Sequence, residues 1–374
     1  MKTKLAIIIS FACLLGCSSP DQGDVSNPSS NNNNSNSGNN GNSNPVNYNF
    51  WSIPKSEVYD GGVGRDGIPA IEDPLFYNFD DARIDTYMFD EDLVVGMVVG
   101  DDARAYPHRI LDWHEIVNDR FENNGQTLTV TINYCPLTGT AFGWKGVFQG
   151  MDTTFGVSGL LYNTNLIMYD RQTQSHWAQM KLKCVNGEKL GVEVETVTIF
   201  ETTWATWKKL YPQSKILSNT QSIQRNYAEY PYGIYRDIDD FFLFPVSRIN
   251  NALPLKERVL AVLGETHATA YRFESFGQGN VFKDQFNGQN LIIFGNPAMM
   301  TAFALPASMT DTTFTFDYDP NLYTHFTDSK GNKWNLLGEV IEGPDKGFKL
   351  TQVKSVMSYW FNIGAFYENP AIFN

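Results

Sequence analysis

Hydrophobic and polar side chains alternate over many short stretches of this chain, and glycine or other turn residues separate the stretches. Residues 127–134 alternate as a half-buried strand does, and residues 291–294 resemble a shorter counterpart later in the chain. Residues 203–210 and 356–366 instead carry aromatic side chains on one helical face, which predicts two short helices packed against a sheet. We therefore predict a mainly β (α+β) fold.

Several motifs occur twice, in the same order and with similar gaps. The matched pairs are residues 93–106 and 258–271, 133–142 and 295–303, 152–155 and 311–314, 165–177 and 321–334, and 207–212 and 360–370. Five ordered matches indicate an internal duplication. We predict two pseudo-symmetric β-rich lobes, at residues 93–212 and 258–374, each closed by one of the short helices. Residues 49–92 are expected to wrap around the lobes, and residues 213–257 to connect them.

The first residues of the chain have the features of an export signal. Lys2 and Lys4 precede the apolar residues 5–15, a stretch that is too short to cross a bilayer as a helix. The stretch ends in the sequence LLGC at residues 14–17, which resembles the lipobox of bacterial lipoproteins. That resemblance implies that Cys17 is lipidated and becomes the first residue of the mature protein.

This resemblance also implies where the protein is held. Residues 1–16 are then a signal peptide, and Ser18 resembles the signal for sorting to the outer membrane. Residues 17–48 consist largely of Asn, Ser and Gly, a composition typical of a flexible linker. We expect an outer-membrane lipoprotein on the periplasmic or cell-surface side, whose partner is the membrane through its lipid anchor.

Composition limits the class of protein further. Charged residues make up only 18% of the 374 residues and aromatic residues 14%, which excludes a disordered chain. The net charge of −13 argues against a nucleic-acid partner, because a phosphate backbone requires a basic surface. Four cysteines are too few for a disulfide scaffold of this length.

Comparison of the two copies points to a candidate site in the first. Cys135 aligns with Asn296, and the pair His114-Glu115 aligns roughly with Gly279-Asn280. Residues 156–164 resemble a loop rich in Gly, Ser and Asn that is about three residues longer than its counterpart. Since only the first copy has a thiol, an imidazole and a carboxylate at these positions, we expect any site to lie there and the second copy to be a scaffold.

The same motifs resemble a known protein family. They are Asp102-Ala-Arg104-Ala-Tyr106-Pro107, His114-Glu115-Ile-Val-Asn118-Asp119, Tyr134-Cys135-Pro136-Leu137-Thr138-Gly139 and Phe155-Gly-Val-Ser158-Gly159-Leu-Leu-Tyr-Asn163, together with residues 66–71 and 168–177. Together they resemble the bacterial domain of unknown function DUF3179, over nearly the whole folded part. Many members of that family have a second cysteine where this chain has Thr138, which argues against a mechanism that needs a Cys-x-x-Cys pair. The family carries no established activity.

Cys135 allows several interpretations. As a nucleophile, it would use His114 as the base, with Glu115 or Asn118 orienting the imidazole. This alternative makes the protein a thiol-dependent enzyme with Cys135, His114 and Glu115 as candidate catalytic residues. If the thiol is a small buried hydrophobe instead, a non-catalytic interaction module is favoured.

Two further interpretations involve a bond to sulfur. Cys135 and His114 could bind a soft metal such as copper or zinc, with His176 or Met168 as a further ligand. A disulfide from Cys135 to Cys184 is the other alternative outside the cytoplasm. No Cys-x-x-Cys or His-x-x-x-His motif is present, and the cofactor is left open.

Our leading hypothesis is that the protein binds a small ligand or soft metal, with Cys135 and His114 in contact with it. Other candidate binding residues are Arg104, Ser158, Asn163, Asp170 and Arg171. The Asp170-Arg171 pair could clamp a carboxylate or phosphate, since a guanidinium offers a planar fork, but such a neighbouring pair can also simply stabilise a turn. His108, His267 and His325 have no partner in the sequence and are expected at the surface or in packing.

Overall fold

The computed structural model describes residues 50–148 and 150–373, which belong to one compact unit that comprises residues 45–374. Strands account for 43% and helices for 12% of the structure, so the predicted mainly β class is confirmed. The described strands form six sheets of four or five strands and one two-stranded hairpin of β8 (Val147–Phe148) and β9 (Met151–Asp152). The predicted signal peptide, Cys17 and the linker lie outside the described residues.

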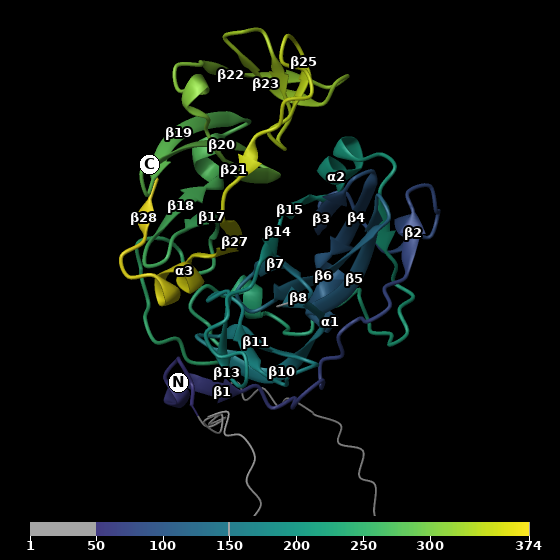
Figure 1. The fold of residues 1–374 in the computed structure, drawn as a ribbon, viewed down its shortest axis with the longest axis vertical. Helices are drawn as coiled ribbons and strands as arrows, with labels where there is room; N and C mark the ends of the chain where they lie inside the picture. The colour runs from purple at the N-terminus through teal and green to yellow at the C-terminus, as the bar shows by residue number, and fades with distance from the viewer. Residues whose placement is uncertain (1–49, 149, 374) are drawn as a thin grey trace, which may run out of the picture. The chain divides into compact units, whose positions relative to one another are not determined.

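Three sheets belong mainly to the first half of the unit, which is purple to teal in Figure 1. The first has the order β15 (Phe200–Thr203), β3 (Leu93–Val99), β4 (Asp102–Pro107), β16 (Lys215–Leu217), β2 (Phe76–Asn78). The second has the order β14 (Thr196–Val197), β7 (Thr140–Lys145), β6 (Gln126–Cys135), β5 (Ile116–Asn123). The third has the order β1 (Val58–Asp60), β10 (Phe155–Tyr162), β11 (Asn165–Asp170), β12 (His176–Ala178), β13 (Lys183–Asn186).

The other three sheets belong to the second half, which is green to yellow in Figure 1. One has the order β27 (Ser355–Tyr359), β17 (Arg258–Leu263), β18 (Ala268–Arg272), β28 (Ala371–Ile372). Another has the order β19 (Asn280–Phe286), β20 (Gln289–Asn296), β21 (Met299–Ala304), β26 (Thr351–Gln352). The last has the order β22 (Phe314–Asp319), β23 (Thr324–Asp328), β24 (Lys333–Trp334), β25 (Val340–Glu342).

Strand order follows the same scheme in the two halves. The hairpin β3–β4 is flanked by antiparallel β15 and parallel β16, and the hairpin β17–β18 is flanked by antiparallel β27 and parallel β28. Side-chain hydrogen bonds also recur. They join Tyr106 to Asp119 (2.6 Å) and, partly buried, Tyr271 to Asp284 (2.7 Å), and they join Trp177 to Asp170 and Trp334 to Asp328 (both 2.9 Å). Each half therefore has its own set of matching internal contacts.

Three short α-helices follow strands of the two hairpin sheets. They are α1 (His108–His114), α2 (Trp204–Leu210) and α3 (Trp360–Phe366). The helix predicted at 203–210 is confirmed as α2, which Thr203 caps by accepting a hydrogen bond from the backbone N–H of Thr206 at 3.3 Å. The prediction for 356–366 is wrong in its first part, because residues up to Tyr359 pair with β17 as strand β27.

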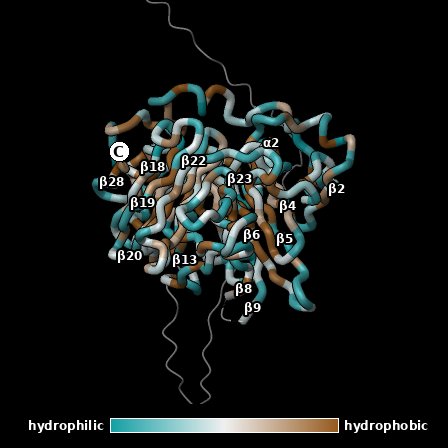
Figure 2. The backbone as a smooth tube through the Cα atoms, turned by 90° about the horizontal axis from the view of Figure 1, so that it is seen from above, coloured by the Kyte–Doolittle hydropathy of each residue, from teal (hydrophilic) through white to brown (hydrophobic). Residues whose placement is uncertain are grey.

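The hydrophobic core is continuous across the two halves. One cluster of buried side chains joins Val95 and Trp207 of the first half to Phe294 and Trp334 of the second, and another joins Trp177 to Trp360. In Figure 2 the brown, hydrophobic stretches lie mainly in strands, whereas connecting loops are mostly teal. Burial of large aromatic side chains from both halves therefore holds them together.

A tyrosine-rich segment, residues 227–235, crosses the end of α1 and the turn after β6. We refer to it as the tyrosine strap. Its four hydroxyls contact the first half: Tyr227 with His114 Nε2 (2.8 Å), Tyr230 with the Pro136 carbonyl (3.3 Å), Tyr232 with Glu115 Oε1 (2.9 Å) and Tyr235 with the Leu137 carbonyl (2.9 Å). The segment after it is held by Lys256, whose Nζ donates to the carbonyls of Tyr235, Ile238 (2.6 Å) and Phe241 (2.7 Å).

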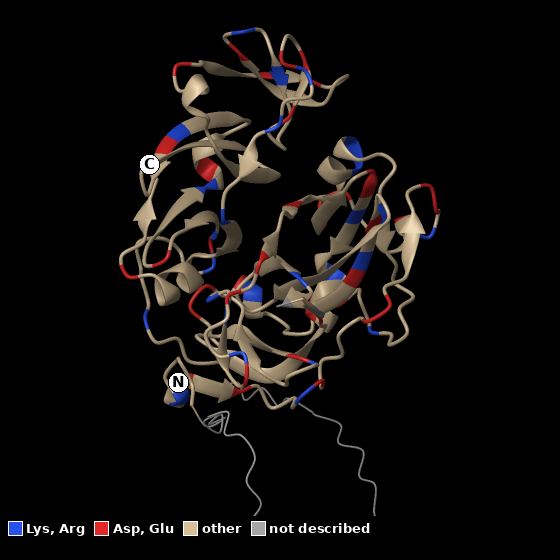
Figure 3. Cartoon of the chain, in the orientation of Figure 1, with Lys and Arg blue, Asp and Glu red and all other residues tan. Residues whose placement is uncertain are grey.

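Charged residues are spread over both halves rather than gathered on one. Figure 3 shows blue and red bands along β4 and β5, where Arg104 pairs with Asp102 and Asp119. Among the helices within the described ranges, none combines the length and apolar character needed to cross a bilayer.

Candidate functional site

His114 and Glu115 lie together at the end of α1, as the sequence predicts, but their side chains are held by the tyrosine strap. His114 is buried, and its Nδ1 lies 2.8 Å from the carbonyl oxygen of Pro69. Because a carbonyl only accepts, Nδ1 carries the proton, and Nε2 of the neutral ring accepts from the Tyr227 hydroxyl. Burial lowers the pKa of His114, which favours this neutral form. Neither ring nitrogen is left for Cys135.

Glu115 ends the helix in an unusual backbone conformation. Its φ is 58°, a left-handed value that costs on the order of 1 kcal/mol for a residue other than glycine. This turn directs the carboxyl group into the interior, where Oε1 accepts a hydrogen bond from Tyr232. Burial raises the pKa of Glu115 to about 7, so the group is largely neutral in mildly acidic solution.

Cys135 is the last residue of β6 and is also buried. Its thiol donates a weak hydrogen bond to the carbonyl of Thr164 at 3.7 Å. Burial, together with the nearby Glu115, raises the pKa of Cys135 to about 11, the opposite of what an activated nucleophile needs. Cys135, Glu115 and Tyr232 line a mostly apolar cavity of about 60 Å³.

Neither of the two interpretations that involve a bond to sulfur of Cys135 is supported by the surrounding side chains. Both Cys135 and Cys184 are free thiols, so the disulfide alternative is wrong. Within residues 50–148 and 150–373, no group of three or more His, Cys, Asp or Glu side chains is arranged to hold a metal ion. Of the further metal ligands considered, Met168 packs in the core and His176 bonds Asn186 through Nδ1 at 2.9 Å.

The other predicted site residues are engaged in separate structural contacts. The two arginines form ion pairs: Arg104 with Asp102 and Asp119, and Arg171 with Asp66 and Glu72. Ser158 donates to the carbonyl of Ile167, and Asn163 accepts from the backbone N–H of Ser247 at 2.8 Å. Asp170 accepts hydrogen bonds from the backbone N–H of Thr173 (2.6 Å) and from the indole of Trp177. Asn118 bonds Thr131 and the backbone of Phe155 rather than His114. The structure therefore does not bring these residues together in one site.

The expected loop at residues 156–164 is largely a strand. Residues up to Tyr162 belong to β10, and a bulge between Val157 and Leu160 accommodates Ser158 and Gly159. Asn163 and Thr164 form the tight turn to β11, both with positive φ. The prediction of a loop is wrong because the Gly and Ser residues form a bulge within the ladder instead of interrupting it.

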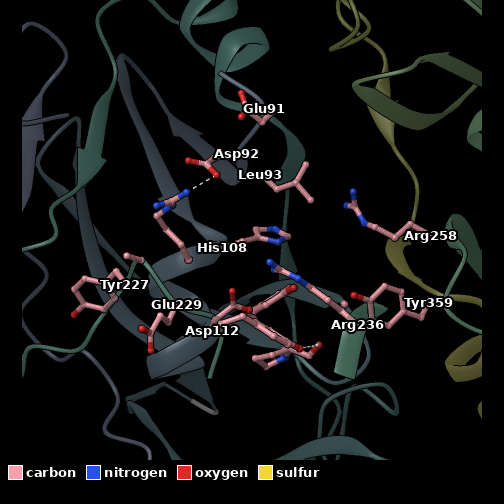
Figure 4. A pocket seen from close by; sticks show the side chains of 16 residues that line it. Glu91, Asp92, Leu93, His108, Asp112, Tyr227, Glu229, Arg236, Arg258 and Tyr359 are labelled. Atoms are coloured by element: carbon pink, nitrogen blue, oxygen red, sulfur yellow. Dashed lines mark hydrogen bonds and ion pairs between the residues drawn. The ribbon is translucent and has the colours of Figure 1, made fainter. Parts of the chain in front are cut away.

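A larger pocket, about 310 Å³, opens beside these residues on the other side of α1 (Figure 4). We refer to it as the α1 pocket. Its wall is formed by α1 (His108, Arg109, Asp112), by residues 91–93, by the end of β6 and the turn that follows it, by residues 227–230 and Arg236, and by Arg258 and Tyr359 of the second half. Figure 4 shows the side chains of His108 and Arg236 extending towards each other, with Arg258 opposite.

His108 contributes an imidazole without a well-aligned hydrogen bond. Its Nε2 lies 3.5 Å from Oε2 of Glu201, and both atoms are buried without a hydrogen-bond partner among the described residues. The ring packs on Tyr134, with 4.4 Å between the ring centroids. Arg258 forms an ion pair with Oε1 of the same Glu201. Although burial opposes it, Arg258 and His108 hold the pKa of Glu201 below its ordinary value.

Asp112 lies one helical turn after His108 and therefore on the same face of α1. It is 6% exposed, and no hydrogen bond to it is formed by the described residues. Burial raises the pKa of Asp112 to about 7, while Arg236 and Arg109 act in the opposite direction. A carboxylic acid without a partner thus faces the pocket.

The arginines of the pocket differ in how they are paired. Arg109 donates to Asp92 at 2.6 Å, but its Nε is buried without a partner in the described part of the chain. Arg236 stacks over the Tyr230 ring, 4.4 Å from its centroid, and forms no ion pair with a described residue. The pocket therefore retains unused hydrogen-bond donors next to a buried acid.

The sequence analysis missed His108 and Asp112. His108 packs on Tyr134, as expected of a packing residue, and it also lines the α1 pocket and faces Glu201, 93 positions further along the chain. The only signal in the sequence was the spacing of four between His108 and Asp112.

These features define a mainly β protein in which a short helix presents polar groups to a small pocket. The chain belongs to the family described as "Protein of unknown function (DUF3179)", which it matches over residues 65–370. No curated protein and no solved structure was found to match the chain. The resemblance predicted from the motifs is thus confirmed, and the family provides kinship without an activity.

Proposed function

We propose that this DUF3179 protein binds a small anionic molecule in the α1 pocket. The observation that supports the proposal is a pair of arginines with unused hydrogen-bond donors: Nε of Arg109 is buried without a partner among the described residues, and the exposed guanidinium of Arg236 forms no ion pair with them. Buried polar groups in proteins are nearly always satisfied, so the Nε of Arg109 favours a ligand that supplies the missing acceptor, and the guanidinium of Arg236 can pair with the same ligand at the surface.

Three arginines of the pocket wall can attract an anion, and the acidic residues that line the pocket include the exposed Glu91 and Glu229. Arg109 is offset by Asp92, and Arg258 by Glu201. Asp112 is neutral below about pH 7, which leaves the positive charge of Arg236 uncompensated by any described ion-pair partner. Arg236 can therefore pair with a carboxylate or a similar group, to which a guanidinium offers two parallel donors.

Size and wall chemistry limit the ligand to a small molecule. A volume of about 310 Å³ is at the lower end for a ligand pocket. The rings of Tyr134, Tyr230 and Tyr359 are part of the wall and offer apolar faces beside their hydroxyls. A compact organic acid fits these surroundings better than an inorganic ion, which would leave the aromatic faces without contact.

This proposal keeps the small-ligand hypothesis and moves its site. Cys135 and His114 would not contact the ligand, since the thiol lies in the separate small cavity and both imidazole nitrogens are bonded. No observation favours the soft-metal, thiol-enzyme or interaction-module alternatives over it.

Isothermal titration calorimetry with acetate, pyruvate, phosphate and sulfate tests the proposal. We expect an organic acid of this panel to bind the purified protein, and Arg236→Ala to weaken binding at least about tenfold through loss of a charged hydrogen bond. Arg248→Ala, an exposed change on the same connecting segment, is the matched control and should leave the affinity unchanged. No binding by any member, or equal loss in both variants, would remove the proposal.

We also propose that the protein is an outer-membrane lipoprotein anchored through Cys17. The lipobox-like residues 14–17, the preceding apolar stretch and the polar linker support this address. Metabolic labelling with a fatty acid should mark the wild-type protein in the outer-membrane fraction, and Cys17→Ser should abolish the label. A labelled Cys17→Ser protein would contradict the proposal.

A duplication is the third part of the proposal. It is supported by the matched strand orders and by the recurring Tyr–Asp and Trp–Asp hydrogen bonds. Tyr106 and Asp119 are 13 positions apart, as are Tyr271 and Asp284. Equal spacing between equivalent contacts is what descent from one ancestral copy would leave.

A further inference from the structure

His108, Glu201 and Asp112 together resemble an acid–base pair with its own orienting group. Nε2 of His108 faces the carboxylate of Glu201 at 3.5 Å, and Nδ1 has no partner among the described residues. Because a carboxylate only accepts, Glu201 favours the tautomer with its proton on Nε2, which leaves the lone pair of Nδ1 free to act as a base.

Asp112 complements this base with an acid. The two side chains are four positions apart on α1, so they point to the same face of the helix and line the same pocket. Burial raises the pKa of Asp112 to about 7, and a neutral carboxylic acid can donate a hydrogen bond or a proton. A base and an acid thus lie on one face of α1 and line the same pocket.

We propose that the α1 pocket catalyses proton transfer on a small 2-oxo carboxylate, with His108 as the base and Asp112 as the acid. The inference rests on the proposed function, since Arg236 must first bind the carboxylate of the substrate. Glu201 acts through His108 and is a positioning residue. The substrate class follows from the geometry, because an acid beside a base suits a carbonyl oxygen next to a carbon that carries hydrogen.

The reaction balances without an oxidant or a reductant. His108 Nδ1 takes a proton from the carbon beside the carbonyl, and the electron pair of that C–H bond forms the C=C bond of the enol. The π electrons of the C=O bond move to oxygen, which takes the proton of Asp112. In reverse, oxygen returns its proton to Asp112 and the carbon takes a proton from His108. If His108 has exchanged with D2O in between, the carbon gains deuterium.

Proton NMR in D2O with pyruvate as the probe tests this step. We expect the purified protein to speed the loss of the pyruvate methyl signal, and His108→Asn and Asp112→Asn each to slow the catalysed exchange by about 100- to 10,000-fold. Glu201→Gln should lower the exchange rate at saturating pyruvate with little change in KM, as a positioning role predicts and a general loss of structure does not. Arg248→Ala is the control with unchanged exchange.

Calorimetry with the same pyruvate solution separates the two proposals. If pyruvate binds but its methyl signal persists as in buffer, acid–base chemistry is excluded and the binding proposal stands. If another anion of the panel binds and pyruvate does not, the 2-oxo acid substrate class is overturned. If no anion binds, the proposed function itself fails. Both asparagine variants should keep the wild-type melting temperature within a few degrees, and exchange that survives in both folded variants would also overturn the inference.

Discussion

The segment between β4 and β5 differs from the segment between β18 and β19, although the Tyr–Asp pairs that flank them, Tyr106–Asp119 and Tyr271–Asp284, are both 13 positions apart. In the first half it forms α1 and carries His108, Asp112 and His114. In the second half the equivalent positions are Phe273, Gly277 and Gly279, in and after a short 3-10 helix. The Tyr–Asp hydrogen bonds on either side are the same. The residues on either side of the segment thus make the same structural contact in both halves, whereas the side chains within the segment differ.

The second half could not accept the side chains of the first without moving. A Cβ added at Gly279 would lie 2.1 Å from the ring of Phe316, and Gly277 has a φ of 53° that favours glycine. In the first half, the position equivalent to Gly279 carries His114, which contacts the tyrosine strap. In the second half, the ring of Phe316 packs against the corresponding glycine instead. The difference between the halves is therefore fixed by neighbouring strands as well as by the segment itself.

The largest effect should come from the contacts that the halves share. Trp177→Ala and Trp334→Ala each remove a fully buried ring and its hydrogen bond to an aspartate, so each should destabilise the protein by about 3–5 kcal/mol. Calorimetric melting measures both, and Phe89→Ala, an exposed change, is the control. A large loss in only one half would break the equivalence of these contacts.

A somewhat smaller effect should follow from making Glu115 like its counterpart Asn280. The raised pKa of Glu115 means that the folded protein holds a proton which the unfolded chain releases near pH 4.5, so stability falls as pH rises from there to above 7. Glu115→Gln keeps an acceptor for Tyr232 and should remove about 3 kcal/mol of this fall. Melting temperatures from pH 4 to 8 measure it. A steeper fall in the variant would contradict the assignment.

Next comes a glycine pair in the second half. Gly279→Ala should destabilise by about 1–3 kcal/mol, because Phe316 must shift. Gly277→Ala, where an added Cβ meets no atom within 4 Å, should cost only about 1 kcal/mol for its backbone conformation. Chemical denaturation compares the two variants. An equal loss of stability in the two variants would mean that Phe316 moves aside at no cost. Packing against Phe316 would then not be the reason for glycine at position 279.

The smallest effect concerns the thiol. Cys135 is a buried, unpaired cysteine, so Cys135→Ala should cost on the order of 1 kcal/mol and leave anion binding unchanged. Calorimetric titration with the anion that binds best provides the measurement, with Cys184→Ala as a matched control. Loss of binding in the first variant alone would return the site to Cys135.

The sequence pattern predicted those elements that depend on residues close to each other in the chain. The alternation at residues 127–134 predicted the middle of β6, and Thr203 caps α2 as its type suggests. The start of α3 was not predictable, since Val356 and its neighbours suit a strand or a helix and only pairing with β17 decides between them. A ladder partner almost 100 positions away leaves no trace in the local pattern.

The sequence predicted the region of the candidate site but not the residues that line the pocket or their contacts. His114 and Glu115 do lie beside the pocket, yet they contact Tyr227 and Tyr232, which are over 110 positions distant. The pairing of His108 with Glu201 depends equally on tertiary structure. Burial, which changes the pKa of Asp112, cannot be read from composition at all.

Lys256 has a consequence that its hydrogen bonds alone do not express. Its ammonium group lies among the carbonyl oxygens of Tyr235, Ile238 and Phe241, a setting in which other proteins often hold a free metal ion. A cation that is part of a side chain cannot be removed by a chelator. Burial lowers the pKa of Lys256 to about 8, so we expect the segment that follows the tyrosine strap to respond to alkaline pH rather than to the metal ions in the medium.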